Sequence, residues 1–389
     1  MITGDAAYIK RINRSSIIRN IIKEGMISRA DLSKVTDLTR ATISVQVADL
    51  LEEGLIVETQ LEHNSVGRKP IMLSLNGSAG FALGIDLDSG KISFILSDLL
   101  GQPVSTKSVE LKTNDYAKIL HILIEEIKNF QENTPVSEYG IVGIVIAIHG
   151  LVSKDEIIHF VPRLNWSNIH LKEDLKKEID IPLYIENNAN LCSFAERVYQ
   201  HHETDYLLCT TLYSGIGIGM MMNDEFFRGY DGFAGEAGHM IIVPSGKPCN
   251  CGNKGCWEKY ASEASIFEQL SSARNLEDLT YDQIQAWIES GDQEVIDLME
   301  QLLYYLSIGL NNLINMYNPD TLVLESELLH IYPDSLEKIK ANLTSSTSHY
   351  QGLLISPLGK GAVVLGACAL AIKNFLDVPM LNFSLESNA

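Results

Sequence analysis

The chain has 389 residues, 46% of them apolar and 21% charged, which is enough sequence for two or three globular domains. The start, MITGDAAYIK, lacks the apolar core of a signal peptide, and no apolar run approaches the length of a membrane span. We therefore expect a cytoplasmic protein. The formal net charge of −20 is uneven, since residues 1–80 hold 10 basic and 9 acidic residues and the remainder holds 20 and 41. Because an acidic surface repels a polyanion, any contact with nucleic acid must come from the N-terminal part.

Three helices are predicted in the first eighty residues. The segment NRSSIIRNIIKEG has isoleucines at helical spacing between Ile17 and Ile22 and ends at Gly25. In SRADLSKVT, Ser28 is a candidate N-cap, with Asp31 three residues later. A short turn leads to TRATISVQVADLLEEG, whose predicted apolar face consists of Ile43, Val47, Leu50 and Leu51. Two short helices joined by a tight turn, the second longer, indicate a helix-turn-helix.

The third helix carries short polar and basic side chains suited to DNA. Its predicted exposed face begins with Thr39, Arg40, Thr42, Ser44 and Gln46. Hydroxyl, amide and guanidinium groups at this end of the helix suit phosphates and base edges in a major groove. The segments LIVETQ and IMLSLN predict two strands around the loop LEHNSVGRKP, a wing with Arg68 and Lys69 at its tip. With Ser28, these residues predict a winged helix-turn-helix that binds DNA; the alternative is a helical bundle that binds protein.

Beyond NGSAG (76–80), a predicted linker, strands and helices alternate. FALGIDLDSGKISFILSDLLGQPV predicts a β-hairpin, and YGIVGIVIAIHGLVS a buried strand. IPLYIENNANLCSFAERVYQ predicts a strand ending in polar residues before a helix, and DYLLCTTLYSGIGIGMMMND predicts two strands around a glycine-rich turn. DTLVLESELL predicts a late strand, and GAVVLGACALAIKNFL a closing helix. This order predicts an α/β protein with its site at the strand ends.

Three of the six cysteines lie within eight residues of the segment HMIIVPSGKPCNCGNKGCWE. In a reducing compartment such spacing favours metal ligands over disulfide partners. His239, Cys249, Cys251 and Cys256 form a Cys3His set, which closes a tetrahedral zinc and leaves no position open for water. We therefore expect a structural zinc; the alternative is a group of reduced surface thiols.

The order of these segments, with FAGEAGHM and CNCGNKGCWE, resembles the ROK family of bacterial sugar kinases and sugar-responsive repressors over essentially the whole chain. Short segments such as SRADLS, GRKPIMLSLN and GCWEKYASE are most similar to those of the xylose-operon repressors of Gram-positive bacteria. The resemblance implies a winged helix-turn-helix over residues 1–76 and an α/β two-lobe, sugar kinase-like body of the actin-like ATPase type over 81–389. One lobe is expected at roughly 81–190 with the C-terminal helix, and the other at 191–360.

Neutral sugars need carboxylates and amides that form paired hydrogen bonds with vicinal hydroxyls. The resemblance implies five sugar-binding residues: Asn187, Asn188, Glu236, His239 and Glu258. His239 would then offer one ring nitrogen to the metal and the other to a hydroxyl. Asn165, in PRLNW, is a further sugar-binding candidate, and a plain turn residue is the equal alternative.

The features that a kinase of this family needs are altered at four elements. Asn188 stands where the resemblance places the aspartate that deprotonates the sugar, and an amide cannot accept that proton. The first phosphate loop keeps Asp86 in DLDSG but loses its glycine pair and threonine, and the second begins with Tyr213 and Ser214. Glu325 and Ser326 replace a glycine-rich segment on the nucleotide side, where a carboxylate repels phosphates. We therefore expect no enzyme activity.

The resemblance implies a homodimeric repressor that binds a palindromic operator and releases it when D-xylose binds. The alternatives are a repressor that responds to glucose or an amino sugar, one that has lost its sugar response, and an active sugar kinase with an added DNA-binding domain.

Overall fold

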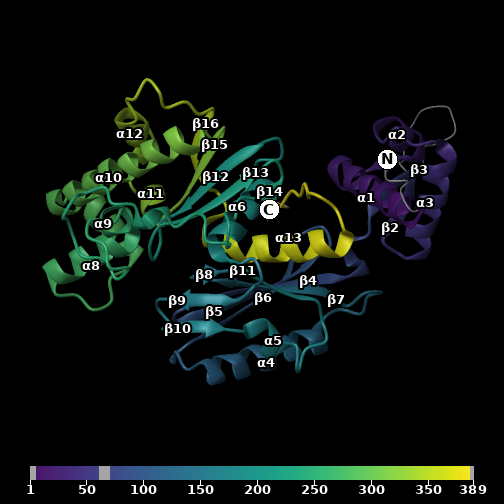
Figure 1. Ribbon diagram of the computed structural model, residues 1–389, viewed down its shortest axis with the longest axis horizontal. Coiled ribbons are helices and arrows are strands. Elements are labelled where there is room, and N and C mark those ends of the chain that lie inside the picture. Colours follow the sequence, from purple (N-terminus) through teal and green to yellow (C-terminus); the bar gives the residue numbers. More distant parts are fainter. Residues whose placement is uncertain (1–5, 61–70, 386–389) are drawn as a thin grey trace. The chain divides into compact units, whose positions relative to one another are not determined.

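The computed structural model describes residues 6–60 and 71–385 (Figure 1). The chain divides into two compact units. Unit 1 contains the chain up to Asn188, Val198–His202 and the chain from Val364 onward. Unit 2 contains Ala189–Arg197 and Glu203–Val363.

Unit 1 begins with three helices and a small sheet. The helices are α1 (Ala6–Glu24), α2 (Arg29–Val35) and α3 (Arg40–Glu52). The sheet has the order β1-β3-β2, with β1 (Ile27–Ser28), β2 (Ile56–Gln60) and β3 (Ile71–Leu75). The predicted N-cap is confirmed, because the Ser28 hydroxyl accepts a hydrogen bond from the Asp31 amide. Thr39 caps α3 in the same way, so both helices start where the sequence predicts.

The buried face of α3 agrees with most of the prediction and differs from it at two residues. Ile43, Val47 and Leu50 are buried, while Leu51 is only partly buried. Gln46 is 5% exposed, so the prediction that it lies on the open face of α3 is wrong. It sits one residue before Val47, and the buried stripe of a helix is wide enough to include it. Arg68 and Lys69, the predicted wing tip, lie outside the described residues.

The segment predicted as a linker is packed against unit 1. A 3-10 turn, η1 (Gly77–Ala79), occupies it, and Ala79 is 3% exposed. The Leu99 amide donates to the Gly77 carbonyl at 3.0 Å, and the Tyr139 amide donates to the Ala79 carbonyl at 2.9 Å. The N-terminal part is thus joined to its neighbour by a short, hydrogen-bonded connection.

The main sheet of unit 1 has five strands in the order β11-β7-β4-β5-β6. They are β4 (Phe81–Asp88), β5 (Lys91–Asp98), β6 (Pro103–Glu110), β7 (Ile141–Ile148) and β11 (Leu183–Asn187). The pairs β4–β7 and β7–β11 are parallel, and β4–β5 and β5–β6 are antiparallel. A second sheet follows β7, with β8 (Leu151–Val152), β9 (Ile158–Val161) and β10 (Trp166–Ile169).

Helices cover both faces of this five-stranded sheet (Figure 1). One face packs on α4 (Tyr116–Asn133) and α5 (Leu171–Leu175), through a core that includes Ile85 of β4 and Leu123 of α4. The other face meets α13 (Ala362–Leu376) at Gly84, where an added Cβ would lie 2.4 Å from the Val364 carbonyl oxygen. Side chains alternate between the faces of a strand, and Gly84 permits the close approach of α13.

Unit 2 repeats the same sheet topology. Its order is β14-β13-β12-β15-β16, built from β12 (Tyr206–Thr211), β13 (Gly217–Met222), β14 (Glu225–Phe226), β15 (Thr321–Glu325) and β16 (Gly352–Ile355). Again the first three strands are antiparallel and the last two are added in parallel. Each sheet therefore carries the carboxyl ends of three adjacent parallel strands on one edge, where α/β proteins bind ligands.

The helices of unit 2 enclose its core on one face of the sheet. They are α7 (Glu258–Ala261), α8 (Glu263–Arg274), α9 (Tyr281–Glu289), α10 (Gln293–Tyr317), α11 (Glu327–Ile331) and α12 (Ser335–Asn342). The other face receives α6 (Asn188–Tyr199), where the Cys192 and Cys209 sulfurs are 3.4 Å apart. Trp257 is fully buried and donates from its indole nitrogen to the Tyr305 carbonyl of α10 at 2.9 Å.

Residues Gly359–Leu376 are apolar and long enough to cross a membrane by length and composition alone, contrary to the expectation that no run approaches this length. This window is 67% buried within the protein. Cys368 and Ala371 of α13 lie against Gly84 and Gly143 of the sheet. The apolar character of α13 therefore follows from its place in a core.

The contact between α10 and Trp257 yields a test of the packing. A Cβ added at Gly309 would lie 2.0 Å from the indole ring of Trp257. Because the ring is enclosed, we expect Gly309→Ala to destabilise unit 2 by about 1–3 kcal/mol. This cost exceeds the stability that alanine gains over glycine from its higher helix propensity. Chemical unfolding followed by tryptophan fluorescence measures the loss. The control is Gly361→Ala, whose Cβ meets no atom within 4 Å; equal stability of the two variants would contradict this packing.

Candidate metal centre and ligand-binding residues

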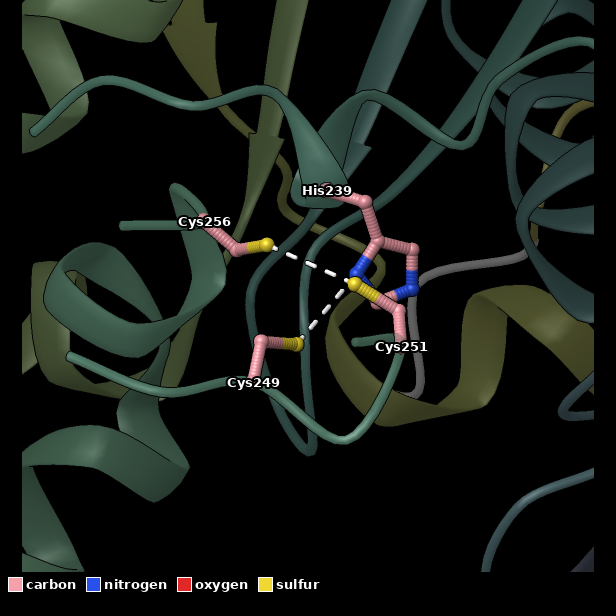
Figure 2. A group of neighbouring side chains, drawn as sticks. All are labelled: His239, Cys249, Cys251 and Cys256. Atoms are coloured by element: carbon pink, nitrogen blue, oxygen red, sulfur yellow. Dashed lines mark hydrogen bonds between the residues drawn. The ribbon is translucent and has the colours of Figure 1, made fainter. Parts of the chain in front are cut away.

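Three cysteines and one histidine of unit 2 bring their ligand atoms to within 4.8 Å of one another (Figure 2). His239 ends the short η2 (Ala237–His239), Cys249 and Cys251 lie in the following loop, and Cys256 comes two residues before α7. The Sγ atoms of Cys251 and Cys256 are 3.6 Å apart, and Cys249 Sγ is 3.6 Å from His239 Nδ1. The four predicted ligands therefore converge on one point.

The spacing of these atoms fits one tetrahedral metal ion. A zinc–sulfur bond of about 2.3 Å separates two ligands of a tetrahedron by about 3.8 Å, close to the observed distances. A disulfide would need its sulfurs about 2.05 Å apart, and all six cysteines are free. Four protein ligands leave no position for a reacting water, so an ion held here would support structure.

The loop that carries these ligands has little regular structure. Single β-bridges pair Ile241 with Cys256 and Pro248 with Lys254. Gly255 has φ +91°, and a Cβ there would lie 1.8 Å from the Val243 carbonyl oxygen. Only glycine fits this position, because it tolerates both the positive φ and the close backbone. The convergence of the four side chains thus adds to the backbone hydrogen bonds that shape this loop, such as that from the Gly255 amide to the Lys247 carbonyl at 2.8 Å.

Two carboxylates flank the imidazole of His239. Glu258 Oε1 lies 3.5 Å from His239 Nδ1 and accepts from the Cys249 thiol at 3.1 Å. Glu236 Oε2 lies 3.8 Å from His239 Nε2, too far for a direct hydrogen bond. Glu236, His239 and Glu258 thus form one polar group at the edge of the metal cluster. The ring nitrogen that faces away from the thiols stays available to a ligand.

The asparagines predicted to bind sugar belong to unit 1. Asn187 ends β11, and Asn188 is the first residue of α6. The Asn187 side-chain amide donates to the Gly150 carbonyl at 2.9 Å. Asn165 is exposed with φ +55° just before β10, so it does occupy a turn. Its role in sugar binding stays a prediction.

The exposed side of α3 is less polar than predicted. Arg40 and Ser44 are exposed and Thr42 is partly buried, but Val45, 60% exposed, shares this surface. Arg40 has no ion pair among the described residues, whereas Arg14 and Arg29 are held by Glu53 and Glu58. Arg40 is therefore the basic group of this helix that is free to bind a phosphate.

In unit 2, the residues predicted to replace the nucleotide loops bind one another. The Tyr213 hydroxyl donates to Glu325 Oε2 at 3.2 Å, and the Ser326 hydroxyl donates to Glu263 Oε1 at 2.7 Å. Glu325 and Glu263 are both 1% exposed. Glu325 ends β15 and Glu263 begins α8, so both buried carboxyl groups and their hydrogen bonds occupy this region.

Sequence reasoning missed several of these groups. Glu196 and Glu263 lie on helices α6 and α8, and no motif marks a glutamate there as buried. His149 directly follows β7, so its place at a strand end was a signal that could have found it. Its side chain is 2.7 Å from Asp86 Oδ1, the aspartate retained from the first loop.

Burial raises the pKa of Glu325 to about 7. The neighbouring Glu196 charge adds to this rise, and hydrogen bonds from Ser356 and Tyr213 oppose it. The folded state therefore binds a proton at this site at a pH where an exposed glutamate has lost it.

Comparison with known proteins gives concordant results. The family model described as "ROK family" matches residues 82–374. The xylose repressor of Bacillus spizizenii is 35% identical over 96% of this chain and 98% of its own length. A crystal structure of a ROK family transcriptional regulator, described as a homologue of the Escherichia coli MLC protein, has a TM-score of 0.80 and 28% identity and covers 95% of this chain and 96% of its own. A ROK family glucokinase from Streptomyces griseus, in complex with glucose and AMPPNP, has a TM-score of 0.64 and 25% identity and covers 75% and 99%.

The buried Glu325 predicts how stability depends on pH. Its folded-state pKa of about 7 lies above the usual 4.5, so the folded state binds more protons between these values. The contribution of Glu325 to the free energy of unfolding therefore falls as the pH rises from 4.5 to 7, by up to about 3 kcal/mol. Glu325→Gln cannot titrate, so its stability relative to wild type should rise over this interval.

Chemical unfolding of wild type and Glu325→Gln between pH 4.5 and 8 measures this difference. Glu277→Gln, which changes an exposed carboxyl of the same unit, serves as the control and should show no such trend. A difference between wild type and Glu325→Gln that does not change with pH would show that Glu325 is already ionised in the folded protein.

Proposed function

Because this chain belongs to the ROK family, we propose that it is the sugar-responsive repressor of a xylose-utilisation operon, released from its operator by D-xylose. One observation carries the proposal: the similarity to a xylose repressor spans 96% of the chain and so includes the N-terminal helices as well as the body. The glucokinase similarity covers 75% of the chain.

The protein is not a kinase. Asn188 has an amide in place of the carboxylate that would accept the proton of the sugar. Glu325 and Glu263 lie buried near the strand ends and bind Tyr213 and Ser326. These side chains fill the region with hydrogen bonds of their own, and above pH 7 the charge of Glu325 opposes the binding of nucleotide phosphates.

The DNA-binding part of the proposal rests on the N-terminal helices. A short capped α2 followed by the longer α3 has the form of a helix-turn-helix, and the antiparallel β2–β3 pair has the place of a wing. The proposed contacts are Arg40, Thr42 and Ser44 of α3, the N-cap residues Ser28 and Thr39, and the predicted wing-tip residues Arg68 and Lys69. A homodimer would place two such helices on the halves of a palindromic operator.

The sugar-binding part rests on Glu236, His239 and Glu258. Two carboxylates and an imidazole offer acceptors and a donor for vicinal hydroxyls. We propose Asn165, Asn187 and Asn188 as further sugar-binding residues. These groups bind hydroxyls of a pentose or a hexose alike, so D-xylose is inferred from the similarity to a xylose repressor. A coupling of about 1–3 kcal/mol between sugar and operator would change operator affinity by about 5–150-fold, and operator DNA would weaken sugar binding by the same factor.

We propose that the metal is zinc and that it supports the loop next to the sugar. Three thiols and one imidazole are the ligands that structural zinc sites use. His239, Cys249, Cys251 and Cys256 would hold the ion, and the charge of the ion would stabilise the thiolates. The proposed location is the cytoplasm, where free thiols persist.

Operator binding tests the main proposal. In a gel-shift titration with the promoter of the xylose operon, wild type should bind, and D-xylose should weaken binding by about 5–150-fold. Arg40→Ala should weaken operator binding. If Arg40 contacts a phosphate, the slope of log affinity against log salt concentration should also become shallower by about one. Glu236→Ala should bind the operator normally but fail to respond to D-xylose.

Lys128→Ala is the control for the change of charge, because Lys128 lies on α4 and pairs with Glu178. It should leave both operator binding and sugar response unchanged. A protein that does not shift the promoter, or that shifts it regardless of every sugar tested, would refute the repressor proposal.

Metal analysis tests the zinc site. Purified protein should contain about one zinc per chain, and a strong chelator should lower its melting temperature, because the metal stabilises only the folded state. Cys251→Ala should lose the zinc, while Cys209→Ala, which removes a thiol elsewhere in unit 2, should keep it. Equal zinc content in these two variants, or none in wild type, would contradict the site.

A further inference from the structure

His149 of unit 1 is held in place by a carboxylate at the end of a strand. It follows β7 directly, and its Nε2 lies 2.7 Å from Asp86 Oδ1 of β4. The side chains of His149 and Asp86 are 20% and 16% exposed, so each is mostly buried but still reaches solvent. Neither belongs to the predicted sugar-binding set.

The pair lies on the ligand-binding edge of the unit 1 sheet. Strands β4, β7 and β11 are adjacent and parallel, with Asp86 and Glu186 both opposite Ala147 in the register. The carboxyl ends of such strands meet at one edge. Asn187 reaches across this edge, because its side-chain amide donates to the carbonyl of Gly150, the residue after His149. The His149–Asp86 pair is therefore next to a proposed sugar-binding asparagine.

Each member of the pair has one polar atom left for a ligand. His149 Nε2 and Asp86 Oδ1 bind each other, and Nδ1 and Oδ2 have no hydrogen-bond partner within residues 6–60 and 71–385. A ring nitrogen and a carboxylate oxygen side by side match a donor and an acceptor on neighbouring hydroxyls. The hydrogen bond between the two side chains also fixes the orientation of the ring, which lowers the cost of binding.

The charges around the pair favour a neutral ligand. Burial alone would lower the pKa of His149, but the charge and hydrogen bond of Asp86, with the charge of Asp88, raise it above its usual value in spite of Arg163. Arg163 lies beside the same turn, with its guanidinium 3.5 Å from the Ser89 hydroxyl. Two carboxylates thus face one imidazole and one guanidinium, and this balance does not favour an anion such as a phosphate.

We propose that His149 and Asp86 bind a hydroxyl of the effector sugar and so contribute to its selection. This inference rests on the proposed function, since it needs a sugar effector. The proposal gives Asp86 a role in sugar binding, because the segment DLDSG lacks the glycine pair and threonine of the phosphate loop that the resemblance implies for kinases. A site built to hydrogen-bond a hydroxyl discriminates strongly against an analogue that lacks it.

Binding of D-xylose and of its 2-, 3- and 4-deoxy analogues to the full-length protein, measured by calorimetry, tests the pair. His149→Phe keeps a ring but removes its nitrogens, and should weaken D-xylose binding by about 10-fold to 100-fold. For one deoxy analogue the wild type and the variant should bind equally, because the hydroxyl that His149 contacts is already missing. A purely structural role would weaken all four ligands by the same factor.

The matched control is His121→Phe, which removes the imidazole of an exposed histidine–carboxylate pair on α4. It should bind all four sugars as wild type does. Asp86→Asn is the second variant if His149→Phe does not fold, because it keeps the shape of the side chain but loses its charge; it should show the same pattern across the analogues.

The outcomes separate this inference from the proposed function. Wild type that binds no sugar refutes the effector proposal and this inference together. If wild type binds D-xylose, two results refute the role of His149 and Asp86 and leave the repressor proposal intact. Either both variants bind the four sugars as wild type does, or their affinity falls by the same factor for each sugar.

Discussion

The convergence of three thiols and one imidazole is the constraint on which the loop of unit 2 depends. Between η2 and α7 the chain forms only isolated β-bridges, and backbone hydrogen bonds such as those from the Ile242 amide to the Gly255 carbonyl and from the Cys249 amide to the Asn253 carbonyl join its two arms. The cluster ties the start of this loop, at His239, to its end, at Cys256. Glu236 and Glu258 flank these two points, and Trp257 anchors the end of the loop under α10. The four candidate metal ligands therefore lie next to the two carboxylates that the proposed sugar site uses.

The repeated sheet topology explains where the other polar groups gather. Both sheets have three antiparallel strands followed by two parallel additions, so each presents one edge of parallel carboxyl ends. In unit 1 this edge carries Asp86, His149 and Asn187, and in unit 2 it carries Glu325. The two edges differ in character. In the first, His149 and Asp86 bind each other and remain partly exposed, while in the second Glu325 is buried and accepts a hydrogen bond from Tyr213.

This difference gives a physical account of how a kinase-like body serves regulation. Phosphoryl transfer needs open glycine-rich loops that leave backbone amides free for phosphates. Tyr213 and Glu325 instead bond to each other, and burial holds the pKa of Glu325 near 7. Groups that would accept a neutral polyol persist at other positions, around His239 and at the end of β11. Binding energy from such groups can change an equilibrium between conformations without any chemical step.

The sequence alone determined what depends on neighbours along the chain. The helix cap at Ser28, the alternation of strands and helices, and the four candidate metal ligands follow from local spacing, and the structure confirms this cap and brings the four side chains together. The tertiary structure alone decided which residues from distant segments meet. Gln46 is buried by packing on α3, Asp86 meets a histidine 63 residues away, and Tyr213 meets Glu325 over 112 residues. Periodicity assigns a side chain to one face of an element, but only the packed sheet brings two strand ends within hydrogen-bond distance.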